Sequence, residues 1–307
     1  MKRRRVYLSG VVYALTGATL WGLSGTASSA LFSIYHMPYL SLLTVRMLLS
    51  GGLLYLVFRP PLPKSNPALF LVFAFSLMTV QLTYLAAIRY SNAPTATMLQ
   101  YFFLPVVLVY EIMTHRIAVT RILYIFLALA VIGIFELSTS FPAGGLSIVI
   151  SLPGLAFGLM SALAAALYTL LSSPMIERYG TVDSVLWGML AGGAMSVPLG
   201  IFPTFGYISA MRSGSFAPVL ILVLFVSVFG TMIAFTFFIK SMELISATQA
   251  SIAATMEPVS AAVSSLAFLG LALTYMQYAG GVLILLSIIA IQKTSAVQRI
   301  EMPSAPK

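Results

Sequence analysis

The fold of this chain is decided by the stretch APTATMLQYFFLP, residues 93–105, which returns as ATQASIAATMEP at residues 247–258. Both copies begin with two alanines separated by two residues, and both end in a proline. Each lies in a long apolar segment and follows a basic residue, Arg89 in the first copy and Lys240 in the second. The sequence therefore predicts two halves built on one pattern.

Apolar residues dominate both halves. They make up 60% of the chain, and charged residues make up only 7%, whereas charged residues form about 25% of an ordinary soluble domain. A membrane hydrocarbon core about 30 Å thick requires roughly 20 apolar residues per helix. We therefore expect an all-α integral membrane protein with ten transmembrane helices. The expected spans are 8–30, 38–58, 67–88, 93–113, 120–138, 152–173, 184–204, 217–239, 246–269 and 274–292.

The ten expected spans divide into two repeats of five, residues 8–138 and 152–292, followed by a polar cytoplasmic tail at 293–307. Because five is an odd number, the second repeat must cross the membrane in the opposite orientation to the first. Inverted repeats of this kind are typical of secondary transporters. The connectors leave no room for a separate soluble catalytic domain.

The distribution of basic residues predicts the orientation. If the N-terminus is inside, Arg89 and Arg212 are the only outer residues among the 16 lysines and arginines, and Arg46 lies within a span. This asymmetry satisfies the positive-inside rule, so we expect both termini in the cytoplasm. The formal net charge of +9 then reflects membrane topology and requires no nucleic-acid partner.

Residues that hold metals or cofactors are scarce. The chain has no cysteine, and its two histidines, His36 and His115, fall in separate connectors. We therefore predict no catalytic residue, no metal and no cofactor. The sequence also lacks the Gly-x-x-x-x-Gly-Lys-Ser/Thr motif of ATP-binding loops, so uphill transport would need an ion gradient or a partner protein.

The order of the motifs resembles the EamA-type branch of the drug/metabolite transporter superfamily. The resemblance is carried by RYSNAPTATMLQY at 89–101 with Pro105, by ATQAS at 247–251 with Glu257-Pro258, by Gly270, Thr274 and Gly280, and by Trp21-Gly22 and Arg46. It covers about residues 8–292. It implies ten helices in two inverted repeats that move small organic solutes, often outward.

Arg46 lies near the middle of the second expected span, where a charged side chain costs about 2.5–3.5 kcal/mol on insertion scales. Such a residue normally faces the bundle interior or a wet cavity. It could bind an anionic group of a substrate, such as a carboxylate. Alternatively, it could form a structural ion pair or cap helix carbonyls.

Glu257 is the only acidic residue near the middle of a span, and Pro258 follows it. The proline frees a backbone carbonyl one turn earlier and can kink the helix. Burial disfavours the charged form of a carboxyl group, so we predict Glu257 as a site for proton coupling or for a substrate amine. The alternative is a structural carboxyl group, which could pair with Arg46.

Polar and aromatic residues within other spans predict the lining of a cavity, because a pocket with apolar walls and a few fixed polar groups suits small organic molecules. The predicted substrate-binding residues are Arg46, Trp21, Gln81, Tyr84, Gln100, Tyr101, Gln249 and Glu257.

These observations favour a secondary transporter that works by alternating access. An arginine and a glutamate at mid-depth suit a zwitterion, so we expect amino acids or related metabolites, and the resemblance favours export. The alternative is a multidrug or organic-cation exporter. An intramembrane enzyme would need a nucleophile with a base, or a metal cluster, at membrane depth, and the sequence shows neither. The expected partners are a small organic solute, protons as a candidate coupling ion, and the lipid bilayer; the sequence does not indicate an oligomeric state.

Overall fold

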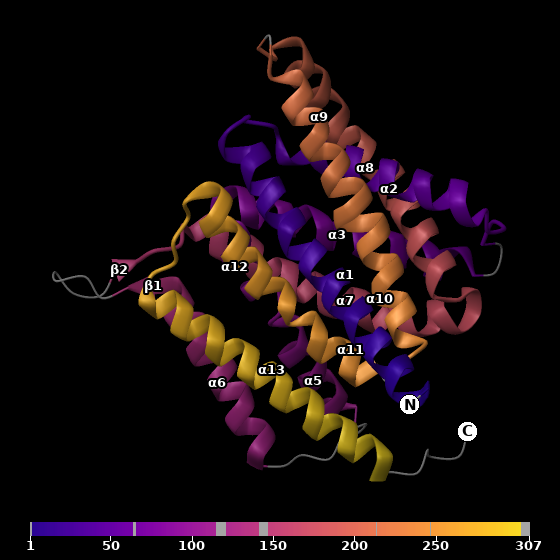
Figure 1. The fold of residues 1–307 in the computed structure, drawn as a ribbon, viewed down its shortest axis with the longest axis vertical. Helices are drawn as coiled ribbons and strands as arrows, with labels where there is room; N and C mark the ends of the chain where they lie inside the picture. The colour runs from indigo at the N-terminus through magenta and orange to yellow at the C-terminus, as the bar shows by residue number, and fades with distance from the viewer. Residues whose placement is uncertain are drawn as a thin grey trace.

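The computed structural model describes residues 2–63, 66–114, 121–140, 147–212, 214–245 and 247–301 (Figure 1). Helices form nearly all of this part of the chain. Its only strands are β1 (Thr139–Ser140) and β2 (Ser147–Ile148), which pair antiparallel in the connector between the two halves. The expectation of an all-α chain is confirmed, and this two-residue ladder is a detail of the connector. His115 and residues 302–307 of the expected tail lie outside the described residues.

The first half contains six helices within the described ranges. They are α1 (Lys2–Ser33), α2 (Tyr39–Phe58), α3 (Pro67–Tyr90), α4 (Ala93–Gln100), α5 (Phe103–Met113) and α6 (Arg121–Ser138). The second half begins with the long helices α7 (Leu152–Tyr179) and α8 (Thr181–Ser209). It continues with α9 (Phe216–Leu224), the π-helix η1 (Phe225–Ile233), α10 (Ala234–Met242), α11 (Ala247–Ala254), α12 (Met256–Leu269) and α13 (Tyr275–Glu301).

Three helices begin with the same local chemistry, a polar cap followed by a proline. The side chains of Asn66, Asn92 and Ser151 each accept a hydrogen bond from the backbone N–H three residues later. A proline occupies the first or second position of each helix, where its missing N–H costs nothing. The sequence thus fixes where α3, α4 and α7 start.

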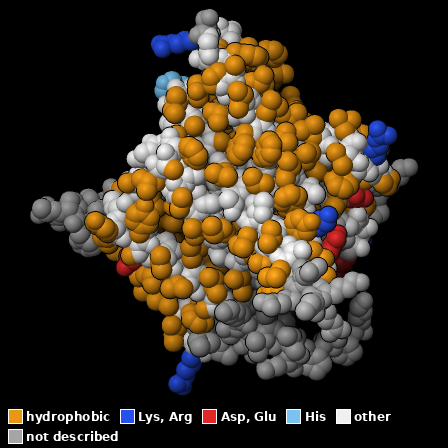
Figure 2. All heavy atoms as spheres, in the orientation of Figure 1, with side chains coloured by type: hydrophobic (Ala, Val, Ile, Leu, Met, Phe, Trp, Pro, Cys, Tyr) orange, Lys and Arg blue, Asp and Glu red, His pale blue; other side chains and the backbone are white. Residues whose placement is uncertain are grey.

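Eight helical stretches in the described ranges are long and apolar enough to cross a membrane by length and composition, and three of them include parts of more than one of the helices named above. Two shorter apolar helices, Tyr124–Ser138 and Tyr275–Ala290, accompany them. Figure 2 shows that hydrophobic side chains cover most of the visible face. Large apolar residues such as Phe202 and Phe268 are exposed on the surface of the molecule. A protein surrounded by lipid is expected to have such an apolar surface.

Two of the expected spans are interrupted at matching positions. The helix expected at 93–113 divides into α4 and α5, and the helix expected at 246–269 divides into α11 and α12. Pro105 and Pro258 are each the third residue of the second piece. A proline has no N–H for the carbonyl four residues earlier, which here belongs to Tyr101 and Ala254. The two repeated sequence stretches therefore form two broken helices.

The strongest helix packing joins one half of the chain to the other. The helix pairs with the most extensive packing are α2 with α8, α3 with α7, α6 with α13, and α1 with both α12 and α10. Figure 1 shows α13 alongside α6. The largest buried apolar cluster contains residues of both halves, such as Leu42, Leu85 and Met189. The two halves thus share one core rather than forming separate bodies.

Candidate functional site

A cavity of about 430 Å³ lies between the two halves. Seven of the eight predicted binding residues line it: Trp21, Arg46, Gln81, Tyr84, Gln100, Tyr101 and Glu257. They come from α1, α2, α3, α12 and the region of the α4–α5 break. Gln249 is not among the lining residues, because it lies on α11 with an exposed side chain. A substrate-binding role for the seven lining residues stays a prediction.

Arg46 is buried, with 6% of its surface exposed, yet it reaches the cavity from α2. Its Nε donates a hydrogen bond to Thr231 Oγ1 at 3.0 Å. The Thr231 hydroxyl in turn donates to the carbonyl oxygen of Val226 at 3.0 Å. The neutral Thr231 side chain therefore holds the guanidinium through Nε, and within the described part of the chain the two terminal nitrogens stay available for a ligand.

Glu257 lies on α12 beside the helix break, and its Oε2 accepts a hydrogen bond from the Tyr101 hydroxyl at 3.1 Å. The same hydroxyl donates to the Ala254 carbonyl oxygen at 2.7 Å. This is the carbonyl that Pro258 deprives of its helical partner. A phenolic hydroxyl has one proton, so the Glu257 carboxylate and the Ala254 carbonyl compete for it.

Arg46 and Glu257 do not form an ion pair with each other in the described structure. Each is held by a different neutral side chain, Thr231 for Arg46 and Tyr101 for Glu257. Both line the same cavity. The sequence-based alternative of a structural pair between them is therefore not what the structure shows.

Other predicted residues are fixed by neutral partners. The Tyr84 hydroxyl shares a hydrogen bond with Thr97 Oγ1 at 2.9 Å, and Gln100 Nε2 donates to Ser161 Oγ at 2.8 Å. Trp21 packs against Phe235 and Phe238, with ring centroids 5.1 and 5.0 Å apart. The Trp21 Nε1 atom is buried without a hydrogen-bond partner. These contacts preset the shape of the cavity wall.

Sequence reasoning missed the face that α7 contributes to the cavity. Tyr168, Ser172 and Ile176 recur every four residues and line the cavity together, as residues on one helix face do. Their spacing was the available signal. This signal was ambiguous because a serine can donate to a carbonyl oxygen of its own helix, as Ser172 does to Tyr168. A polar residue can therefore occur in an apolar helix without facing a cavity.

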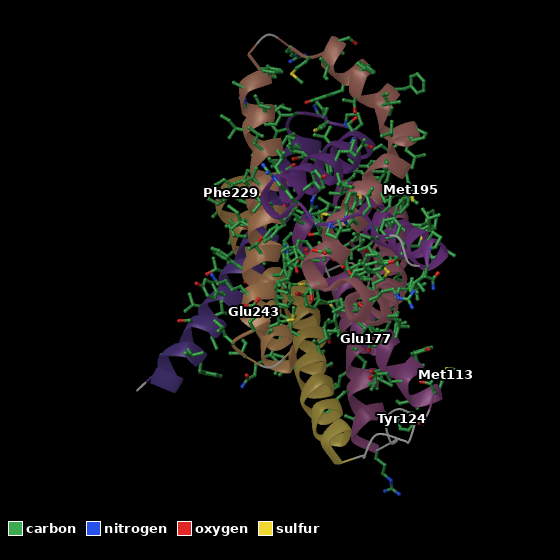
Figure 3. The ribbon with its side chains drawn as sticks, turned by 90° about the vertical axis from the view of Figure 1, so that its right-hand side faces the viewer. Met113, Tyr124, Glu177, Met195, Phe229 and Glu243 are labelled. Carbon is green, nitrogen blue, oxygen red and sulfur yellow. The ribbon has the colours of Figure 1, made fainter. Side chains whose placement is uncertain are left out.

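The cavity extends toward one end of the molecule. Its lining there includes Ile176 near the end of α7, Thr181 at the start of α8 and Met242 at the end of α10. Figure 3 places Glu177 and Glu243, which follow Ile176 and Met242 in the chain, below Phe229 and Met195.

Side chains join the helices at the opposite end of the molecule. Tyr90 stacks on Phe157 with ring centroids 5.7 Å apart, and Arg89 donates to the Phe32 carbonyl oxygen at 3.3 Å. The Tyr207 hydroxyl likewise donates to the Tyr35 carbonyl oxygen at 2.9 Å. These contacts tie α1, α3, α7 and α8 together at the end that the cavity does not reach.

Comparison with known proteins identifies the family. Residues 8–139 and 152–292 match the EamA-like transporter family. Over 296 residues the chain is 33% identical to the uncharacterized inner membrane transporter YicL of Salmonella typhimurium, covering 93% of this chain and 96% of that protein. A solved crystal structure of a protein with 16% sequence identity covers 95% of this chain and 99% of its own, with a TM-score of 0.61, and shares the fold. The resemblance seen in the sequence is thus confirmed, and the chain belongs to the EamA-like transporter family.

Proposed function

We propose that the protein is a secondary transporter that exports zwitterionic metabolites, such as amino acids, across the cytoplasmic membrane by alternating access. The observation that carries this proposal is the presence of Arg46 and Glu257 in one cavity without an ion pair between them. A zwitterion supplies a carboxylate for the arginine and an ammonium group for the glutamate. Both charges then gain a partner, which offsets the cost of removing them from water.

The cavity disfavours the alternative of an organic-cation exporter. A cation could pair with Glu257 and contact the aromatic rings of Trp21 and Phe235, which also line the cavity. It would nevertheless enter a site that already contains the positive charge of Arg46. Repulsion between like charges in a site of low dielectric constant costs more than it does in water. A ligand with both charges avoids that cost.

The helix packing supports the proposed membrane architecture of ten helices in two inverted repeats. The second helices of the two repeats, α2 and α8, pack together, as do the last helices, α6 and α13. The contact of α3 with α7 has its counterpart in the contact of α10 with α1. Reciprocal contacts of this kind are what a two-fold relation between repeats produces. The positive-inside rule then puts both termini in the cytoplasm.

In this orientation the cavity extends toward the cytoplasm, since the ends of α7 and α10 lie on the cytoplasmic side. The substrate would be loaded from the cytoplasm, and the contacts of Tyr90 with Phe157 and of Arg89 with Phe32 would have to separate for its release. Protonation of Glu257 is the proposed coupling step. It removes the negative charge that holds the substrate ammonium group, and so favours release on the outer side.

Counterflow in proteoliposomes tests this function. Vesicles loaded with unlabelled L-leucine should accumulate labelled L-leucine, with saturation, whereas a channel would show no counterflow. The substitutions Arg46→Ala and Glu257→Gln should each reduce uptake at low substrate concentration by about 10–100-fold, the effect of losing a hydrogen bond to a charged group. Arg212→Ala and Glu243→Gln are matched controls on exposed residues. Equal activity of all four variants, or export of organic cations alone, would contradict the proposal.

The same vesicles test the proton step. An imposed pH gradient should drive leucine transport by the wild-type protein, and Glu257→Gln should remove that dependence. Glu243→Gln should keep it. A pH-driven flux that persists in Glu257→Gln would assign the coupling to another group.

A further inference from the structure

The π-helix η1 lies between α9 and α10 and faces the first half of the chain. It comprises nine residues, Phe225–Ile233, of which Val226, Ser227, Gly230 and Thr231 are buried. Hydrogen bonds of the π type, from residue i to i+5, are rare in proteins and occur frequently at functional sites. We therefore ask which side chains this π-helix positions.

Two hydrogen bonds fix η1 to α2. The Ser50 hydroxyl donates to the Ser227 carbonyl oxygen at 3.0 Å, and Arg46 Nε donates to Thr231 Oγ1 at 3.0 Å. Arg46 and Ser50 are one turn apart on α2. Their two acceptors lie four residues apart on η1. The pair of bonds sets the register of η1 against α2, and the Ser50 bond maintains that register independently of Thr231.

The polarity of the Thr231 hydroxyl is also fixed. Its single proton is donated to the Val226 carbonyl oxygen, five residues earlier on η1. Only lone pairs of the oxygen then remain, and these accept the Nε proton of Arg46. The π-helix thus presents a neutral acceptor, at a defined place, to a group that is always a donor.

We infer that Thr231 is a positioning residue that aims the Arg46 guanidinium into the cavity and thereby sets selectivity for substrates that carry a carboxylate. The inference rests on the proposed function. Because the guanidinium is planar, a bond to Nε restricts the direction of its two terminal nitrogens, and these form the fork that binds a carboxylate at two points. Without the Thr231 hydroxyl, the long Arg46 side chain regains rotamer freedom. Substrate binding must then remove that freedom, which weakens it.

Binding measurements on Thr231→Val test the inference, since valine keeps the shape of threonine and lacks its hydroxyl. The reporter is the fluorescence of Trp21, which lines the cavity. It is measured in a Trp187→Phe background, because Trp187 lies in a separate surface depression.

The probes are L-leucine, L-leucinamide, which lacks the carboxylate, and 4-methylpentanoate, which lacks the ammonium group. Thr231→Val should weaken binding of the two carboxylates about tenfold and leave leucinamide unchanged. Thr231→Ser should bind all three as the wild type does.

A matched control separates positioning from general damage. The Thr236 hydroxyl donates to the Met232 carbonyl oxygen, one turn earlier in the chain, at 2.7 Å. The substitution Thr236→Val should therefore change none of the three affinities. Thr231→Ala is measured beside Thr231→Val and gives the same comparison if the valine variant does not fold. Equal weakening of all three probes by the Thr231 variants, or no weakening of any, overturns the inference.

The Arg46→Gln variant distinguishes failure of the inference from failure of the proposed function. If Arg46→Gln abolishes leucine binding and Thr231→Val does not alter it, the arginine binds substrate without help from Thr231, and only the inference is overturned. If Arg46→Gln binds leucine normally, or the wild-type protein binds none of the probes, the proposed substrate class is wrong and the inference falls with it.

Discussion

Tyr101 connects the broken helix of one half to the broken helix of the other. It follows α4, and its hydroxyl reaches both the Ala254 carbonyl oxygen at 2.7 Å and Glu257 Oε2 at 3.1 Å. Only 6% of its surface is exposed, so water cannot easily replace the hydroxyl. One side chain therefore stabilises the backbone break and the carboxyl group beside it.

The substitution Tyr101→Phe should lower the stability of the protein by about 1–3 kcal/mol, because it removes the one donor that the Ala254 carbonyl and the Glu257 carboxylate share. The measurement is unfolding in detergent micelles. Tyr124→Phe is the control, since Tyr124 is 59% exposed and its loss should cost little.

A double-mutant cycle tests the reason for that cost. Pro258→Ala restores an N–H group that can bond the Ala254 carbonyl within the helix, so this carbonyl no longer needs Tyr101. The penalty of Tyr101→Phe should then fall by about 1 kcal/mol in the Pro258→Ala background. Additive effects of the two substitutions would show that the bond to Ala254 contributes nothing measurable.

At this scale the sequence predicts the residues whose burial is costly. Arg46 and Glu257 could be identified because a charge at mid-span needs a wet or paired environment, and both line the cavity. Tyr168 could not, because a tyrosine in an apolar helix can face lipid, protein or cavity. Gln249 was expected in the lining for its polarity alone, and the direction of its side chain depends on where α11 is broken from α12.

Helices α1 and α12 pack closely against each other beside the site. A Cβ atom on Gly22 of α1 would overlap Ser260 Oγ and the Glu257 carbonyl oxygen of α12. Only glycine permits this spacing. The distance between the two helices thus fixes where the break beside Glu257 lies relative to Trp21.

The substitution Gly22→Ala should force α1 away from α12 and destabilise the protein by about 1–3 kcal/mol. Transport should fall as well, because Glu257 shifts with its helix. The matched control is Gly52→Ala on α2, where a Cβ atom would meet nothing within 4 Å. Alanine is the better helix former, so this control should be neutral or slightly stabilising. If thermal unfolding shows equal shifts for both variants, close packing at Gly22 is not the cause.

Elements differ in how well their sequence predicts them. Pro258 indicated where a helix can bend, and the break before it agrees with this. The break before Pro105 was not predicted, although the same residue type stands at the matching position. The caps at Asn92 and Ser151 are also local signals. The π-helix η1 has no such signal. Its hydrogen bonds to Ser50 and Arg46 come from another helix, and contacts of that range are absent from the local pattern.

At the scale of the whole molecule, the duplication in the sequence corresponds to the packing of the helices. The two repeated stretches, far apart in the chain, form the two breaks that meet at Tyr101 and Ala254. Composition and repeat order were sufficient to predict a membrane protein of this family. They could not predict which end the cavity reaches, because that depends on how α7, α8 and α10 are spaced at their ends.

Cysteine labelling tests the inverted arrangement that the transport proposal requires. The chain contains no cysteine, so Arg89→Cys and Lys240→Cys each carry a single thiol in an otherwise native protein. Both residues are exposed and lie in the last turn of equivalent helices, α3 and α10. If the repeats are inverted with the N-terminus inside, a membrane-impermeant maleimide should label Arg89→Cys on intact cells, and Lys240→Cys only after the membrane is opened.

The unmodified chain is the control for that labelling and should take up no reagent. Labelling of both cysteines from the same side would place α3 and α10 in the same orientation. The two halves would then be parallel repeats, and the two broken helices, α4–α5 and α11–α12, would not be related by a two-fold axis in the membrane plane. Exposure of a shared site to each side in turn, by rearrangement of two inverted halves, would lose its structural basis.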